Sequence, residues 1–151
     1  MSDQTNVTVS RVINASANDL FDILTLPQRH RDVDGSSMIV SDDRTQRIQA
    51  VGDTFTMNMH HESQGGDYQI ENHVTAYVPN KVVGWAPAAV GEEPSGHTWV
   101  WTLDPQGPDS TEVTLTYDWS AVTDKGLLAH LPAVPKPALE ESLNLLAASV
   151  A

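Results

Sequence analysis

The chain has 151 residues, of which 40% are hydrophobic, so it is long enough and apolar enough to bury the core of one domain. Its formal net charge of -12 opposes binding to phosphate backbones and anionic lipid surfaces, which argues against nucleic acid as a partner. The absence of cysteine excludes disulfides, thiolate metal sites and cysteine nucleophiles.

The N-terminal residues predict where the protein resides. Residues 1–6 have neither the basic start nor the apolar stretch of a signal peptide. No apolar run approaches the roughly 20 residues that are needed to cross a bilayer. We therefore expect a cytoplasmic protein that forms one domain over residues 1–151, without stable insertion into a membrane.

The first part of the chain predicts a strand followed by two short helices. Residues 7–13 are mostly β-branched, as is typical of a strand. Ser16 stands three residues before Asp19, a capping-box pattern that predicts a helix ending at Pro27. A second polar helix or turn is expected over residues 28–34.

Residues 38–120 predict a run of strands separated by turns. The alternation is clear over residues 54–61, where one face is apolar and ends in His61, and the other face is polar. Further strands are expected over residues 68–77, 82–86, 98–103 and 113–119, with turns or loops at 65–67, 79–80, 87–96 and 104–110.

The last two of these strands carry aromatic faces. Trp99 and Trp101 share one face of the first strand, and Tyr117 and Trp119 share one face of the second. Threonines occupy the opposite faces of both strands. This pattern predicts a sheet that is dry on one side only and needs a cover on that side.

The C-terminal residues change from alternation to helical spacing. After Pro137, the residues Leu139, Leu143, Leu146 and Val150 recur on one side of a helix. It is the only long helix that the sequence predicts, so we expect it to cover the dry face of the sheet. The predicted fold class is therefore α+β.

These elements and several local motifs resemble the START-like superfamily (SRPBCC) of lipid-transfer proteins and polyketide cyclases. Residues 12–24 are similar to the family's first strand and helix, although Ser16 stands where the family often has proline. Residues 26–36 resemble a bacterial subgroup motif that ends in Asp-Gly-Ser. Further matches, which extend the resemblance over essentially the whole chain, are Phe55-x-Met57-x-Met59, Asn72-x-Val74, Trp85-x-Pro87, Trp99-x-Trp101-x-Leu103, Tyr117-Asp118-Trp119-Ser120 and Ser142-Leu143-x-x-Leu146-Ala147.

The resemblance implies the helix-grip fold, in which a curved antiparallel sheet wraps around a long C-terminal helix and two short helices follow the first strand. It also implies a hydrophobic cavity, because members bind lipids, sterols, polyketides or plant hormones, and only some members are enzymes. The residues expected to line this cavity are Phe55, Met57, Met59, His61, Asn72, Val74, Trp85, Trp99, Trp101, Tyr117, Trp119 and Leu143. Among them, His61, Asn72 and Tyr117 have polar groups that would orient a ligand carbonyl or hydroxyl. The alternative is that the whole set fills the core.

Histidines and carboxylates suggest few other sites. His30 and Asp34 are four residues apart and would face each other on a helical turn. The pair would either guard the mouth of the pocket, with His30 as a base, or brace the short helix. His60 and His61 point to opposite faces of a strand, so with His73 they make a poor metal site, and we expect no metal or cofactor.

Three functions stay open. The leading hypothesis is binding, sequestration or transport of a small hydrophobic molecule, lipid or polyketide-like, inside the cavity. The second is a polyketide cyclase or dehydratase in which His61, Tyr117 or Asp118 moves protons. The third is a stress-related accessory protein without a ligand. The sequence names neither the ligand nor a reaction nor a pathway, and it leaves open whether the protein is a monomer or a weak dimer.

Overall fold

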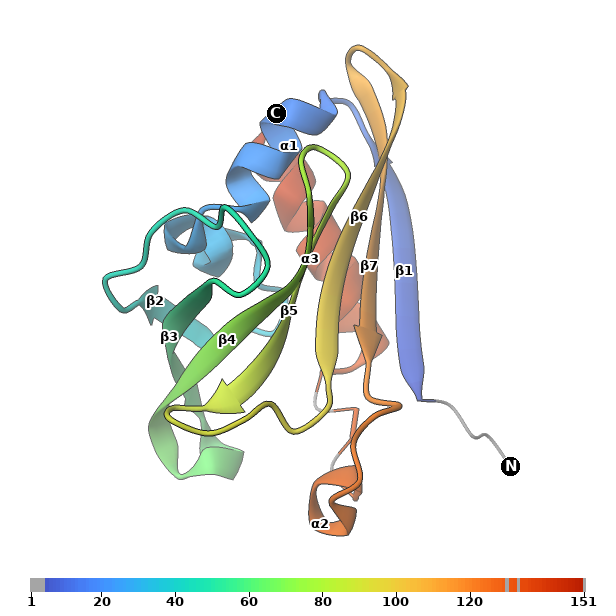
Figure 1. The fold of residues 1–151 in the computed structure, drawn as a ribbon. Helices are drawn as coiled ribbons and strands as arrows, with labels where there is room; N and C mark the ends of the chain where they lie inside the picture. The colour runs from blue at the N-terminus through green and yellow to red at the C-terminus, as the bar shows by residue number, and fades with distance from the viewer. Residues whose placement is uncertain (1–4, 130, 133, 151) are drawn as a thin grey trace.

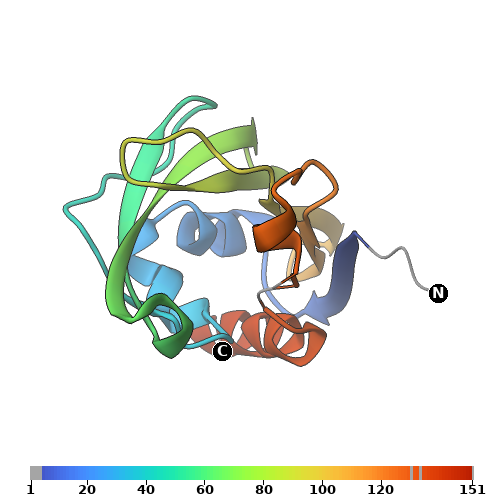
Figure 2. The same cartoon turned by 90° about the horizontal axis from the view of Figure 1, so that it is seen from below.

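The protein forms a curved sheet that holds a long helix in its concave face (Figures 1 and 2). The computed structural model describes residues 5–129, 131–132 and 134–150. Within them, the strands β1 to β7 form one antiparallel sheet with the order β1-β7-β6-β5-β4-β3-β2. Their bounds are Asn6–Ile13, Ile39–Asp42, Thr54–His61, Gly66–Val78, Val82–Ala89, Thr98–Gly107 and Ser110–Asp118.

Helical segments connect the strands and close the concave side. The α-helices α1, α2 and α3 span Ala17–Leu24, Lys125–Leu128 and Lys136–Ser149, and the 3₁₀ helices η1 and η2 span Pro27–Val33 and Glu62–Gln64. The two short helices after the first strand, the antiparallel sheet and the C-terminal helix confirm the predicted helix-grip fold. Sequence patterns did not predict α2 or η2. In the described part of the chain, no helix is both long and apolar enough to span a bilayer.

The start of α1 confirms the predicted cap. The hydroxyl oxygen of Ser16 accepts a hydrogen bond from the backbone N–H of Asp19 at 3.1 Å, which satisfies one of the free donors of the first turn. Behind this cap, Leu20 and Leu24 are fully buried. The helix therefore lies with its apolar face toward the sheet, where it contacts β6.

The β6–β7 hairpin is longer than the sequence predicted. The expected turn at residues 104–110 is wrong, because β6 continues to Gly107 and β7 begins at Ser110. Leu103 donates its N–H to Lys81, so the nitrogen of Pro105, two residues on, faces the same side of the strand. The pairing of β6 with β5 ends near that point, and a proline there removes no ladder hydrogen bond.

The strand β5 is also longer than expected. It reaches Ala89, past Pro87, whereas the sequence predicted a loop over residues 87–96. Residues 86–89 pair with β4 alone, and a strand with one free edge accommodates a proline. The expected turn at residues 65–67 is shorter for a related reason, since Gly66 already pairs with His61 at the start of β4.

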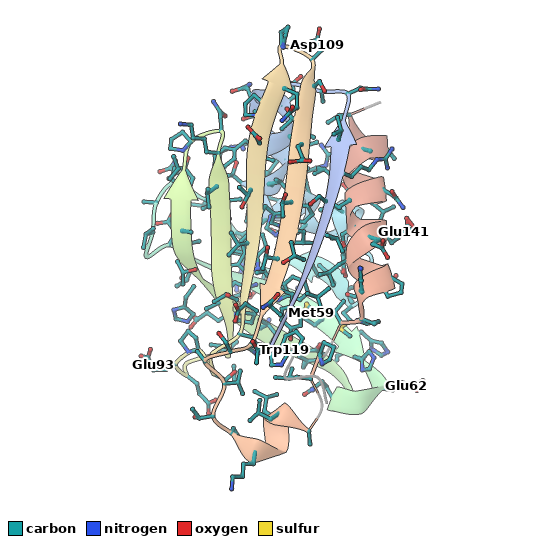
Figure 3. The ribbon with its side chains drawn as sticks, turned by 90° about the vertical axis from the view of Figure 1, so that its right-hand side faces the viewer. Met59, Glu62, Glu93, Asp109, Trp119 and Glu141 are labelled. Atoms are coloured by element: carbon teal, nitrogen blue, oxygen red, sulfur yellow. The ribbon has the colours of Figure 1, made fainter. Side chains whose placement is uncertain are left out.

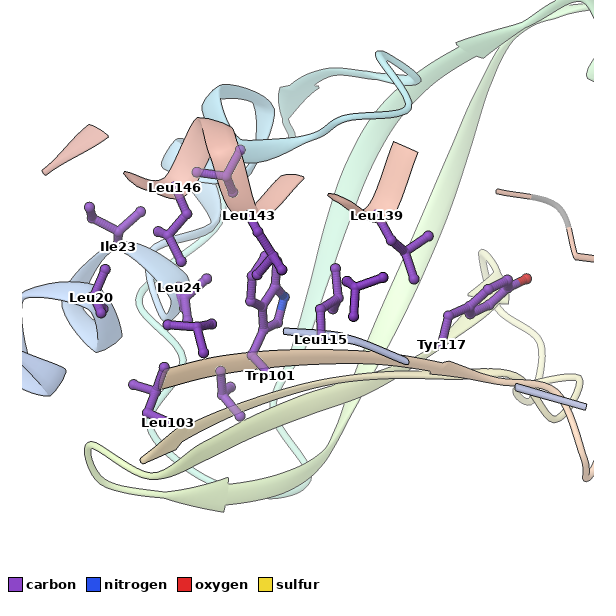
Figure 4. Packing of buried hydrophobic residues seen from close by; sticks show 14 of the residues in the cluster. Leu20, Ile23, Leu24, Trp101, Leu103, Leu115, Tyr117, Leu139, Leu143 and Leu146 are labelled. Carbon is purple, nitrogen blue, oxygen red and sulfur yellow. The ribbon is translucent and has the colours of Figure 1, made fainter. Parts of the chain in front are cut away.

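The helix α3 packs against β1, β7 and η1. Its buried residues are Leu139, Ser142, Leu143 and Leu146, while Val150 is the half-buried C-cap. Figure 4 shows Leu143 pointing from the helix toward Trp101 of the sheet. The helix is thus the cover of the dry face that the leucine spacing predicted.

A close contact joins η1 to α3. Gly35 lies directly against the helix, and a Cβ atom at this position would overlap the carbonyl group of Ala138. The N–H of Gly35 donates to the hydroxyl of Ser142 at 2.9 Å, which explains why a polar residue is buried on this helix. The contact holds η1, and the side chains that it carries, at a fixed place over the sheet.

Candidate functional site

A cavity of about 450 Å³ lies between the concave face of the sheet, η1 and α3. This volume is within the range of about 300–1,000 Å³ that is usual for small-molecule sites. The side chains of Gln64 and Ser95 are exposed and Leu127 is half-buried, so the mouth lies where η2, the β5–β6 loop and α2 meet. Figure 3 shows Met59 and Trp119 toward this end of the molecule, with Asp109 at the opposite end.

The alternation in the sequence predicted many residues on the concave face, but only some of them line the cavity. The predicted residues that line it are Met57, Met59, Asn72, Trp85, Trp99, Trp101 and Tyr117. The predicted residues that do not line it are Phe55, His61, Val74, Trp119 and Leu143. Four of these five are 5% exposed or less and fill the core, and His61 is half-buried at the end of β3. A binding role for any of the set stays a prediction.

Several lining residues were missed by the sequence prediction. Tyr68 and Ile70 share the parity of Asn72 on β4, so the same alternation could have identified them. His30 and Asp34 belong to η1 and the turn after it, and His97 stands just before β6. No periodic signal marks the residues of turns and short 3₁₀ helices as part of a concave wall.

Asn72 carries a buried side-chain amide. The residue is 6% exposed, and this amide forms no hydrogen bond with the residues that the structure describes. Among those residues, every side-chain nitrogen or oxygen that is fully enclosed has a partner. The amide of Asn72 is therefore not enclosed, and it opens into the cavity that it lines.

His30 is buried in an aromatic stack above the sheet. Its ring is stacked on Trp85 with centroids 4.9 Å apart, and it meets Phe55 edge-on at 5.3 Å. Its Nε2 atom lies 2.7 Å from the carbonyl oxygen of Leu24. Burial lowers the pKa of His30 to about 4, although the Leu24 carbonyl and the charges of two aspartates partly oppose this. The neutral ring then donates from Nε2, which leaves Nδ1 as an acceptor.

The expected facing of His30 and Asp34 does not lead to a hydrogen bond between them. The carboxylate of Asp34 instead accepts from the N–H and hydroxyl of Ser36 and from the N–H of Ile39. The segment is a 3₁₀ helix, where residues three apart eclipse each other, so the four-residue spacing does not align the pair. Asp34 braces the turn after η1, and His30 lies inside the protein rather than at the mouth.

A second polar group lies nearer to the mouth. The Nδ1 atom of His97 is 3.1 Å from the hydroxyl oxygen of Tyr117, and burial lowers the pKa of His97. The ring of Trp99 is stacked on Tyr117 at 4.1 Å, which fixes the phenol against β6. Among the three predicted proton carriers, Tyr117 alone lines the cavity, because His61 lies outside it and Asp118 accepts from Ser120.

The described wall of the cavity lacks the positively charged side chains that an anion-binding site usually has. The described lining residues include no lysine or arginine, and their one carboxylate is that of Asp34. Burial and the nearby Asp34 raise the pKa of Tyr68, so this phenol stays protonated at neutral pH. The arrangement can therefore hold an uncharged apolar molecule and offer it a few hydrogen-bonding groups.

A family model matches residues 14–150 of the chain. The model is described as Activator of Hsp90 ATPase homolog 1-like protein. The chain belongs to this family. The START-like superfamily predicted from the motifs is thereby confirmed.

The curated relatives of the chain are longer than the chain itself. Uncharacterized protein Rv0088 of Mycobacterium tuberculosis is 36% identical over 115 residues, which are 75% of this chain and 48% of the relative. The chain thus spans about half the length of the curated relatives that it matches.

Solved structures of similar fold carry different functional names. The Zhui aromatase/cyclase from Streptomyces sp. R1128 is 14% identical with a TM-score of 0.67, over 95% of this chain and 92% of that one. The Aha1 dimer from Colwellia psychrerythraea is 22% identical with a TM-score of 0.59, over 97% and 96% of the two chains. At these identities the likenesses show the shared fold.

Proposed function

We propose that the protein binds a small hydrophobic molecule inside the cavity, to sequester or carry it. The apolar wall supplies affinity by removing ligand surface from water, at roughly 25 cal/mol per Å². A few polar groups, namely Asn72, His30 and the His97–Tyr117 pair, would set the orientation of the ligand. The shared fold alone does not choose this function, since an aromatase/cyclase and an Aha1 dimer have it too.

The observation that carries the proposal is the unpaired amide of Asn72. Burying an amide without a hydrogen bond costs about 1–3 kcal/mol in proteins, so an apolar residue would serve better in a filled core. The amide of Asn72 instead opens into the cavity, where a polar group of a ligand can pair with it. The position therefore favours a cavity that is occupied during function.

A titration with N-phenyl-1-naphthylamine, an uncharged dye that fluoresces in apolar surroundings, tests the proposal. We expect saturable binding of one dye per chain and a change in tryptophan fluorescence, because Trp85, Trp99 and Trp101 line the cavity. Met57→Trp adds bulk to the wall and should weaken binding about tenfold or more. Val12→Trp adds the same bulk at a residue that is 51% exposed, and should leave binding unchanged. Equal binding by both variants, or no saturable binding by the native protein, would contradict the proposal.

A second candidate function is proton-transfer catalysis of the cyclase or dehydratase type. The observation that favours it is the contact of His97 with Tyr117, because an imidazole and a phenol 3.1 Å apart can pass a proton between them. The test is incubation with a short poly-β-ketone and detection of a new aromatic product by absorbance. Tyr117→Phe should abolish such activity while dye binding persists. A product yield no higher than that without protein would exclude catalysis on this substrate.

A further inference from the structure

The side chains of His30 and Asn72 both line the cavity, and each has a polar atom without a hydrogen-bond partner among the described residues. The register places Asn72 of β4 directly opposite Phe55 of β3, and Val74 directly opposite Trp85 of β5. The rings of Phe55 and Trp85 touch each other across β4, with centroids 5.2 Å apart. The ring of His30 contacts both of them, so it lies over the part of β4 that carries Asn72.

The hydrogen-bonding capacity of these groups is specific. With Nε2 engaged by Leu24, the neutral ring of His30 offers only an acceptor, Nδ1. This atom forms no hydrogen bond with a described residue, and it is not enclosed. The side chain of Asn72 offers amide N–H donors and a carbonyl acceptor. A hydroxyl group is able to donate to the imidazole of His30 and to accept from the amide of Asn72 at once.

Other polar groups match the pair less well. A ketone cannot donate to His30. An ammonium group could donate both to His30 and to the carbonyl oxygen of Asn72, but its charge would be desolvated in this mostly apolar wall. A carboxylate cannot donate either, and it would be desolvated in a wall whose described residues hold no lysine or arginine and one aspartate. The rest of the wall is apolar and rich in flat rings, with Trp85, Trp99 and Tyr117 fixed by stacking.

We propose that the natural occupant of the cavity is an uncharged aromatic compound with a hydroxyl group, inserted hydroxyl first so that this group lies between His30 and Asn72. This inference rests on the proposed binding function and narrows it to one chemical class. It further implies that fatty acids and other carboxylates are poor ligands for this protein. The orientation leaves the apolar end of the ligand toward Met59 and the mouth.

Calorimetric titration with three naphthalenes of nearly equal shape tests this inference. 2-Naphthol carries the hydroxyl, 2-methylnaphthalene replaces it with a methyl group, and 2-naphthoate carries a negative charge. We expect 2-naphthol to bind about tenfold or more tighter than 2-methylnaphthalene, since two hydrogen bonds distinguish them. 2-Naphthoate should bind most weakly. Equal affinities for the first two, or tightest binding of 2-naphthoate, would overturn the inference while dye binding still supports the proposed function.

Variants separate the hydroxyl contact from general packing. Asn72→Leu should reduce the preference for 2-naphthol over 2-methylnaphthalene, because one of the two hydrogen bonds is lost while that to His30 remains, and should leave the affinity for 2-methylnaphthalene unchanged. Asn58→Leu is the matched control, because Asn58 lies on the opposite face of β3 and bonds Ser41. It should leave the preference for 2-naphthol intact. A preference for 2-naphthol that is undiminished in Asn72→Leu would overturn the inference. Failure of the dye and of all three naphthalenes to bind would instead refute the binding function itself.

Discussion

The two ends of the concave face follow the same alternation of side chains but are packed differently. Toward α1, Leu20, Leu103 and Leu146 are at most 4% exposed, and Figure 4 shows them gathered at this end of the core. Toward α2, Trp99 stands on the same strand and the same face as Leu103, yet it borders the cavity, as does Met59 of β3. The difference in packing comes from the elements that face the two ends of the sheet. The helix α1, with five buried apolar residues, fills one end, while the other end faces a loop and the helix α2, which has no buried residue. Whether the concave face of a sheet is filled therefore depends on the element that packs against it, and not on the sheet alone.

The largest expected effect is at the closed end. Leu143→Asp places an unpaired charge beside Trp101, and the cost should exceed much of the roughly 5–15 kcal/mol that holds a domain folded. We expect an unfolded or aggregated product by circular dichroism and light scattering. Glu140→Ala, on the exposed side of α3, should melt like the native protein. A Leu143→Asp variant that melts cooperatively near the native temperature would refute the helix-grip packing.

Two truncations to alanine compare the ends directly. Leu146→Ala removes a fully buried side chain from the closed end and should cost about 2–5 kcal/mol in urea unfolding. Met59→Ala removes a half-buried side chain that already borders open space, and should cost under about 1 kcal/mol. Similar losses in the two variants would mean that the open end is packed as tightly as the closed one.

Acid should destabilise the protein through His30. Its pKa is lowered from the ordinary 6.5 to about 4 by burial, so the unfolded chain binds more protons between these values. Stability is then complete above pH 6.5 and falls as pH decreases toward 4, by about 3 kcal/mol in total. In His30→Gln this contribution should vanish, and urea unfolding at pH 7 and pH 4 would show a smaller loss than in the native protein. An unchanged loss would show that His30 is not buried as a neutral ring.

The smallest expected effect, and the most telling, is a gain. Asn72→Leu should stabilise the ligand-free protein by at most about 1 kcal/mol, because it places an apolar group of similar size at a residue that is 6% exposed and whose amide has no hydrogen-bond partner among the described residues. Thermal melts of the native protein and the variant, both freed of bound molecules, provide the measurement. A destabilised variant would indicate that Asn72 has a structural partner, and that the open end is ordinary core.

Much of the fold could be predicted from sequence, because its signals are local. The cap at Ser16, the bounds of β3 at Thr54–His61 and the buried face of α3 follow from capping chemistry and from side-chain period. The candidate site was predicted only in part. The alternation of side chains shows which face of a strand a residue lies on, but not whether that residue is in the core or at the cavity. Phe55 and Met57 were therefore equivalent in sequence, although Phe55 packs in the core and Met57 borders the cavity. His30 is part of the wall only because η1 is held over the sheet by the contact of Gly35 with α3.

Methyl NMR provides the most direct test of the claim that the concave face has an open end toward α2 and a closed end toward α1. With ¹³C-labelled methionine and leucine methyl groups, N-phenyl-1-naphthylamine is added to saturation. The signals of Met57 and Met59 should shift with the dissociation constant seen by dye fluorescence, since both residues line the cavity. The signals of Leu20 and Leu146 at the closed end should stay in place. Unmoved methionine signals, or equal shifts at both ends, would contradict the existence of a ligand cavity between the sheet and its short helices.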